Sequence, residues 1–198
     1  MGATTFLNKK IMISLWFPKA IYFQPNILNN KLGTYEEQIK GAFSSIGTCR
    51  EELKNVDSTH RLEKNIFDVA ELDGLVDEFY KHANLYLDAL GYKKRESLHI
   101  QNCWANISYP GDYLFPHNHG GSVIAGVYYV KCGIDEKIKF FNTPTMLPDP
   151  DEWNERNHQH CEYSCLPSSL LLFTSDIMHG TEKQVCEEKI AISFNMSL

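Results

Sequence analysis

The chain has 198 residues, a formal net charge of −6, a hydrophobic content of 43% and an aromatic content of 12%. This composition describes a globular protein with a packed interior and excludes a disordered or fibrous chain. The acidic balance argues against a protein whose main affinity is for nucleic acid or for an anionic membrane surface. We therefore expect one globular domain over residues 1–198.

Signals for secretion or membrane insertion are missing from the sequence pattern. The apolar residues near the N-terminus are interrupted by Ser14, Pro18 and Lys19, which is untypical of a signal peptide or a membrane span. The six cysteines are expected to be free thiols, because a chain of this size needs no disulfide framework. These features predict a cytoplasmic protein without membrane contact and say nothing of its oligomeric state.

The first third of the chain predicts strand segments followed by a helix. Within residues 1–33, Ile11–Phe23 alternates loosely between apolar and polar residues around Pro18, as in an edge strand. Thr34–Leu53 is expected to form a helix, because Thr34 and Glu37 have the spacing of a capping box.

The clearest predicted helix is Val69–Leu90, where apolar residues recur at three- and four-residue spacing. Asp68 is the expected N-cap, and Gly91 is the expected residue after the C-cap. Residues 34–91 therefore form a predicted helical layer.

After Gly91 the pattern changes to short apolar runs separated by Pro, Gly, Asn and Asp, which predicts a sandwich or barrel of strands. The expected strands are Leu98–Ser108, Ser122–Val130, Lys137–Phe141, Ser169–Thr174 and Ile190–Met196. The longest irregular stretch is 144–165, and its segment 149–165 with Trp153 could be either part of a substrate lid or a variable surface loop.

Three histidines form the clearest candidate for a functional site. His117 and His119 stand one residue apart, so in an extended segment both imidazoles point the same way and can reach one metal ion. His179 follows the apolar run Leu170–Phe173 after a short turn, near another strand end. A single histidine is more often an ordinary surface or core residue. Together, three imidazoles suit iron, zinc, copper or nickel better than magnesium or calcium, so we predict a metal site.

The chain resembles a family of bacterial and bacteriophage 2-oxoglutarate- and Fe(II)-dependent oxygenases, which have the double-stranded β-helix fold. The most specific matching motifs are Trp104-Ala105-Asn106, Gly111-Asp112, His117-x-His119, Gly126-Val127-Tyr128-Tyr129, and Leu172-Phe173 followed by His179. Trp16-Phe17-Pro18 resembles the family's N-terminal aromatic-Phe-Pro element, so the resemblance covers nearly the whole chain. It implies an α+β protein with a jelly-roll, cupin-like core at residues 92–198 and helices packed on the outside of the sheet.

The resemblance also implies an iron site and an oxidoreductase activity. His117 matches the first ligand and His179 the distal histidine, whereas His119 stands where the family usually has a carboxylate. Asp112 and Asp176 are weaker candidates for an oxygen ligand. The implied cofactor is Fe(II), with 2-oxoglutarate and dioxygen as cosubstrates. The implied reaction hydroxylates an unidentified peptide or small metabolite and releases succinate and CO2, with no catalytic residue beyond the metal ligands.

The family holds the distal carboxylate of 2-oxoglutarate with an arginine on a late strand, because a guanidinium fork matches a carboxylate. Lys189 occupies this place here and supplies the charge without the fork, unless it is only a solvated residue at a strand start. Asn106 is the candidate for the proximal end of the cosubstrate, and Ser193, Tyr128 and Lys131 are expected helpers.

Two other metal-binding interpretations remain open. Gly111, His117 and His119 also match the start of a cupin signature, although the glutamate expected near Val123 or Ile124 is missing. A cupin-type dioxygenase or isomerase would turn over without 2-oxoglutarate. A structural zinc site is the second alternative, with ligands from His158, His160, Cys161 and Cys165.

A third alternative is a catalytically degenerate member of the fold that binds a ligand without turnover. It is motivated by the missing carboxylate and arginine.

Overall fold

The structure is a computed structural model that describes residues 19–50, 56–60, 62, 64–93, 97–143, 146–154 and 157–198. Within these ranges the strands form two antiparallel sheets, and two α-helices accompany them. The Trp16-Phe17-Pro18 element lies outside the described residues.

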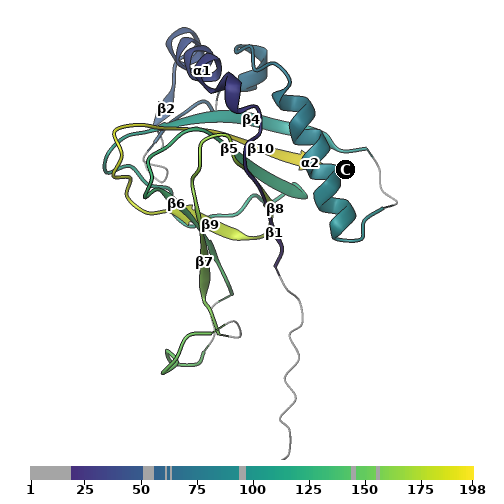
Figure 1. Ribbon diagram of the computed structural model, residues 1–198, viewed down its shortest axis with the longest axis vertical. Helices are drawn as coiled ribbons and strands as arrows, with labels where there is room; N and C mark the ends of the chain where they lie inside the picture. The colour runs from purple at the N-terminus through teal and green to yellow at the C-terminus, as the bar shows by residue number, and fades with distance from the viewer. Residues whose placement is uncertain are drawn as a thin grey trace, which may run out of the picture.

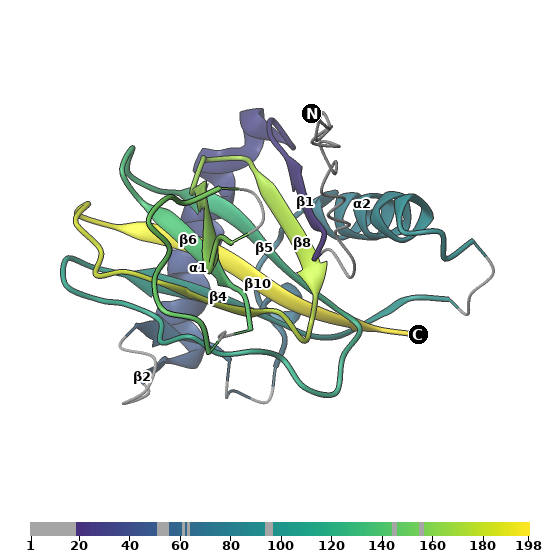
Figure 2. The ribbon, with the colours of Figure 1, turned by 90° about the horizontal axis from the view of Figure 1, so that it is seen from below.

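The larger sheet has seven strands and carries the wall of the later site. Its strands in spatial order are β1 (Ile21–Gln24), β8 (Leu170–Thr174), β5 (Ile124–Lys131), β10 (Lys189–Ser197), β4 (His99–Ser108), β3 (Asp57–Ser58) and β2 (Cys49–Arg50). Figure 2 shows β8, β5, β10 and β4 side by side in this order. β10 lies between β5 and β4, and its Ser193 is in register with Val127 on one side and Trp104 on the other.

The smaller sheet has the order β7 (His160–Ser164), β6 (Lys137–Phe141) and β9 (Met178–Thr181). It faces the side of the larger sheet opposite to the helices, so the helices and the small sheet enclose the large sheet between them (Figure 1). This is the double-stranded β-helix that the sequence resemblance implied. The five strands expected after Gly91 are confirmed, while β7 and β9 were not expected.

The first helix differs at both ends from its prediction. A short 3-10 helix, Asn29–Lys31, continues directly into α1 (Leu32–Ile46), so Thr34 is inside the helix and caps nothing. The predicted end at Leu53 is wrong because Gly47 has φ +80, a left-handed conformation that suits glycine and ends the helix.

The second helix, α2 (Leu75–Ala89), begins six residues later than predicted. Asp68 does not cap it. Its carboxylate instead accepts the N–H of Asn65 at 2.9 Å in a separate 3-10 turn. The predicted C-terminal end is confirmed by a Schellman motif, in which Gly91 (φ +89) donates to Asp88 and the N–H of Tyr92 donates to the Leu87 carbonyl.

Two apolar cores lie on the two faces of the larger sheet. Alternate residues of β5 show the division, because Ile124, Tyr128 and Val130 pack toward the helices and Ala125, Val127 and Tyr129 pack toward the small sheet. The small-sheet core is the smaller of the two. The site described below lies on that side.

None of the helices in the described ranges is long and apolar enough to span a membrane. All six cysteines are free, as expected from the sequence.

Gly126 provides a stability test of the packing between β5 and α2. A Cβ atom at Gly126 would lie 2.3 Å from Cζ of Phe194, whose buried ring stacks on Phe79 with 4.1 Å between centroids. The ring therefore has no room to retreat. We expect Gly126→Ala to lower the free energy of unfolding by about 1–3 kcal/mol in urea denaturation. Gly41→Ala is the control, because nothing lies within 4 Å of its added Cβ and α1 should tolerate it. Equal stability of both variants would contradict the packing argument.

Candidate metal centre

His117 and His179 are brought together by the backbone. The segment before β5 pairs with β9, and the N–H of each histidine donates to the carbonyl of the other at 2.9 Å. Their imidazole rings lie 4.4 Å apart, centroid to centroid. Two residues that are 62 positions apart in the sequence are therefore fixed on facing strands. The sequence indicated their chemistry but could not show this pairing.

The same two rings are oriented by backbone carbonyls. Nδ1 of His117 lies 2.7 Å from the carbonyl oxygen of Phe115, and Nδ1 of His179 lies 2.9 Å from that of Ile177. A carbonyl only accepts, so each Nδ1 carries the proton and each Nε2 is the nitrogen whose lone pair can bind a metal ion. This is the hydrogen-bonding arrangement that commonly fixes the tautomer of a metal-ligating histidine.

His119 completes the group from the same segment as His117. Its backbone N–H donates to Ser175 at 2.9 Å, and its ring stacks on Trp104 with an angle of 20° between the planes. Nε2 of His119 lies 3.2 Å from Nε2 of His179. Two imidazoles at about 2.1 Å from one ion, at right angles, would be separated by about 3 Å, so this distance fits two ligands of the same ion.

The donor set fits a divalent transition metal. One nitrogen from each of the three histidines lies within 4.8 Å of the others, and His179 is buried while His117 and His119 are half-buried. Borderline nitrogen donors of this kind suit iron as well as zinc, copper or nickel. Three protein ligands also leave coordination positions for water or for a chelating cosubstrate.

No carboxylate joins this group among the described residues. Asp112 accepts the N–H of Tyr109 at 2.8 Å and stabilises a turn, and Asp176 is exposed.

The structure also gives no support to the alternative zinc site. His158, His160, Cys161 and Cys165 form no metal-binding group in the described part of the chain. Cys161 is exposed and Cys165 is buried in the core between the sheets.

A cavity between the two sheets extends from the histidines. Parts of β4, β5 and β10 line it, mostly with alternate residues, and the lining includes Trp104, Asn106, Val127, Ala191 and Ser193. Most of its wall is apolar, which limits the access of water to the three histidines.

Three of the five predicted cosubstrate residues line this cavity. Asn106 and Ser193 lie on neighbouring strands, and Nδ2 of Asn106 donates to Oγ of Ser193 at 3.4 Å. Lys189, at the start of β10, also lines it, and its side chain is only 7% exposed. The interpretation of Lys189 as a solvated surface charge is therefore wrong.

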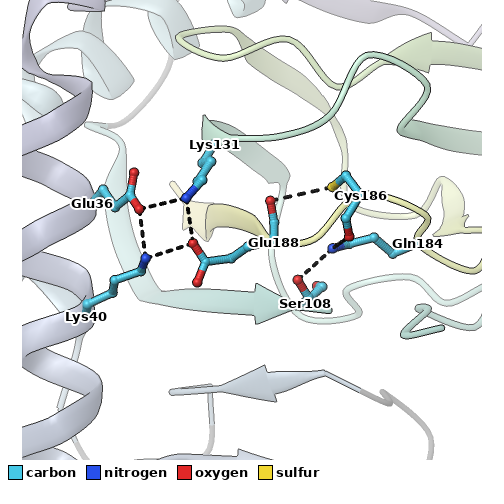
Figure 3. Close-up of polar contacts among 7 residues, drawn as sticks. All are labelled: Glu36, Lys40, Ser108, Lys131, Gln184, Cys186 and Glu188. Carbon is cyan, nitrogen blue, oxygen red and sulfur yellow. Dashed lines mark hydrogen bonds and ion pairs between the residues drawn. The ribbon is translucent and has the colours of Figure 1, made fainter. Parts of the chain in front are cut away.

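The other two predicted residues, Tyr128 and Lys131, do not line the cavity. Tyr128 points into the helix-side core, where its hydroxyl donates to the carbonyl of Ile27 at 2.7 Å. Nζ of Lys131 lies 2.9 Å from a carboxylate oxygen of Glu36 and 2.9 Å from one of Glu188 (Figure 3). Hydrogen bonds to these carboxylates raise the pKa of Lys131, with the larger contribution from Glu188. Both side chains bind other residues away from the cavity, so the prediction that they help to hold the cosubstrate is wrong.

Trp153 is likewise absent from the cavity wall. Its side chain is 49% exposed and stacks on His158 beyond β7, the edge strand of the small sheet. The substrate-lid role stays a prediction.

Sequence reasoning missed three polar residues of the cavity. Ser108, Tyr129 and Thr181 line it, from β4, β5 and β9 respectively. Strict alternation along β5 could have indicated Tyr129 in place of Tyr128, because Val127 and Tyr129 share a face. No signal indicated Thr181, because β9 was not expected.

These features define the class of the protein as a double-stranded β-helix with three converging histidines, a candidate metal centre, beside a largely apolar cavity. Residues 102–195, which run from β4 to β10 and contain the whole histidine group, match the family described as "Putative 2OG-Fe(II) oxygenase". This part of the chain is therefore similar to the 2-oxoglutarate- and Fe(II)-dependent oxygenases, a family of oxidoreductases that use Fe(II) and 2-oxoglutarate. The resemblance seen in the sequence is confirmed. No curated protein matches the chain at a significant level.

Solved structures with the same fold include several oxygenases. A prolyl-4-hydroxylase from Pseudomonas putida has a TM-score of 0.61 at 10% identity, over 91% of this chain and 94% of that chain. A viral collagen prolyl hydroxylase from Paramecium Bursaria Chlorella virus-1, in complex with 2-oxoglutarate, has a TM-score of 0.58 at 12% identity, over 89% and 97%. HygX from Streptomyces hygroscopicus, with nickel, 2-oxoglutarate and hygromycin B bound, has a TM-score of 0.59 at 10% identity, over 90% and 83%.

Proposed function

We propose that His117, His119 and His179 hold Fe(II), and that the protein hydroxylates an unidentified substrate. For each turnover, substrate C–H, dioxygen and 2-oxoglutarate give substrate C–OH, succinate and CO2. The observation that carries this proposal is the convergence of three imidazole nitrogens, two of them fixed by Nδ1–carbonyl bonds, at one end of a cavity that reaches Lys189.

The chain's own residues bind and orient the reactants. Bound Fe(II) supplies the redox chemistry that activates dioxygen. Lys189 provides the positive charge for the distal carboxylate of 2-oxoglutarate, and Asn106 with Ser193 provides amide and hydroxyl groups for hydrogen bonds along the cosubstrate. The apolar wall of the cavity excludes water, which strengthens these polar contacts.

The substrate class we propose is a peptide or a small metabolite, in the cytoplasm. Enzymes of this fold that act on prolyl residues and one that binds hygromycin B support both classes equally. Free cysteines are typical of a reducing compartment and support the location.

The experiment that tests the function is an anaerobic titration of the iron-free protein with Fe(II), followed by 2-oxoglutarate. A chelate of Fe(II) by the 2-oxo acid gives a weak visible charge-transfer band, and exposure to air should then yield succinate. Binding of Fe(II) without the band or succinate would favour a cupin-type enzyme or a ligand-binding member without turnover. A histidine group that contains no carboxylate among the described residues is the observation that favours the latter as second candidate.

His119→Asp tests the least usual ligand. An aspartate would restore the two-histidine, one-carboxylate set and add a negative charge next to the cation, so we expect Fe(II) affinity equal to or above that of the original chain. His119→Ala is the matched control and should bind iron at least about tenfold more weakly. Affinity is measured by competition with a chromogenic Fe(II) chelator. Loss of iron in a folded aspartate variant would show that His119 is no simple substitute for a carboxylate.

A further inference from the structure

A buried ion pair lies where Lys189 borders the cavity, four residues along β10 from Ser193, whose register partner Trp104 stacks on His119. Nζ of Lys189 is 3.4 Å from Oε2 of Glu136, and the two side chains are only 7% and 5% exposed. Glu136 precedes β6, and nothing in its sequence surroundings indicated a role. An ammonium group is costly to bury unless an anion compensates it. Glu136 thus explains how the chain tolerates a buried lysine beside an apolar cavity.

Glu136 is fixed by backbone groups, independently of Lys189. Its Oε1 accepts the N–H of Val185 at 2.8 Å and the N–H of Cys186 at 3.1 Å. Burial by itself would raise the pKa of Glu136, but these two N–H groups, together with Lys189, hold the pKa below its ordinary value. The carboxylate is therefore ionised at neutral pH and stays in place when another anion approaches Lys189.

Lys189 can still bind a second acceptor. An ammonium group has three N–H donors, and a contact of 3.4 Å to Glu136 is long for a hydrogen bond. Lys189 borders the cavity together with Ser108 and Thr181, whose hydroxyls can assist a carboxylate there. A carboxylate that enters the cavity would share the ammonium with Glu136.

We propose that Glu136 is a specificity-determining residue that weakens the binding of the distal carboxylate of a 2-oxo acid cosubstrate. This inference rests on the proposed function, in which Lys189 anchors 2-oxoglutarate. Two carboxylates on one ammonium repel each other, and the repulsion is strong in a poorly hydrated site. A 2-oxo acid without a distal carboxylate does not experience this repulsion. The cavity therefore discriminates less between dicarboxylate and monocarboxylate 2-oxo acids than an unpaired lysine would.

The test compares two ligands that differ only in the distal group. Fe(II)-loaded protein is titrated without oxygen with 2-oxoglutarate and with 2-oxopentanoate, and binding is followed by the visible band and by calorimetry. In the original chain we expect 2-oxoglutarate to bind less than about tenfold more tightly than 2-oxopentanoate. In Glu136→Gln we expect 2-oxoglutarate to bind at least about tenfold more tightly than in the original chain. The affinity for 2-oxopentanoate should change by less than about twofold.

Two further variants isolate the effect of the buried pair. Glu188→Gln removes a nearby carboxylate that pairs with Lys40 and Lys131 outside the cavity (Figure 3). It should therefore leave the ratio of the affinities for 2-oxoglutarate and 2-oxopentanoate unchanged. The double variant Glu136→Gln with Lys189→Met removes both buried charges and should lose the preference for 2-oxoglutarate. It also keeps the test usable if Glu136→Gln alone fails to fold around an uncompensated lysine.

The outcomes separate this inference from the proposed function. If the original chain binds 2-oxoglutarate but prefers it more than about a hundredfold, or if folded Glu136→Gln changes both ligands equally or neither, the role of Glu136 is refuted and the oxygenase assignment stands. If neither 2-oxo acid binds to the iron-loaded original chain, the proposed function fails and the role of Glu136 fails with it.

Discussion

Replacing His179 by alanine is expected to abolish tight Fe(II) binding and, with it, succinate formation. His179 is the most buried of the three histidines, and its Nε2 is made available by the bond from Nδ1 to the carbonyl of Ile177. Loss of a hydrogen-bonding partner behind a metal ligand commonly costs about 10- to 100-fold in metal affinity, so loss of the ligand itself should cost more than about 100-fold. Chelator competition measures the affinity, and succinate release measures turnover.

The control for His179 is another buried histidine on the opposite face of the large sheet. His82 in α2 contacts the hydroxyl of Tyr22 at 2.7 Å and the carboxylate of Glu78 at 3.1 Å, away from the cavity. We expect His82→Gln to bind iron as the original chain does. If His179→Ala keeps one tightly bound iron while its circular dichroism is unchanged, the three-histidine centre is incorrect.

The fold was predictable where one period of side-chain alternation dominates. β6 was predicted to the residue, and β4, β5, β8 and β10 to within two, because each is a short apolar run between turn residues. β9 is only four residues long and contains His179 and Gly180, so its identity as a strand depends on pairing with β6, which no local signal reveals. The helix starts were wrong for two different reasons. The 3-10 turn Asn29–Lys31 runs directly into α1 and leaves Thr34 inside the helix, whereas Asp68 belongs to the separate 3-10 turn Ile66–Asp68 ahead of α2.

The site was predictable in its chemistry but only partly in its geometry. The spacing of His117 and His119 indicated a shared direction, and the structure brings both rings to His179. The register of β5 decides which of its residues face the cavity, and the sequence alone does not fix that register. The prediction was off by one residue, so it named Tyr128 where Tyr129 lines the cavity. Glu136 could not have been found from the sequence, because its role depends on the N–H groups of a loop 49 and 50 residues later.

Gly180→Ala is expected to damage the metal centre without removing a ligand. A Cβ atom at Gly180 would lie 2.7 Å from the carbonyl oxygen of Leu114 and 3.1 Å from the nitrogen of Pro116, so it would press on the backbone that leads to His117. That backbone cannot yield, because Thr181 and Leu114 bind each other through two hydrogen bonds of 3.0 and 2.9 Å. We expect Fe(II) affinity to fall about 10- to 100-fold and the free energy of unfolding to fall by about 1–3 kcal/mol.

Gly120→Ala is the matched control for this effect. Gly120 follows His119 as Gly180 follows His179, but nothing lies within 4 Å of its added Cβ, so iron binding and stability should both be preserved. Chelator competition and urea denaturation on the two variants give a direct comparison. An unchanged iron affinity in Gly180→Ala would mean that the spacing between β9 and the segment before His117 does not set the geometry of the centre. A selective loss there would show that the metal centre depends on one residue without a side chain, because only glycine permits the two ligand-bearing strands to approach this closely.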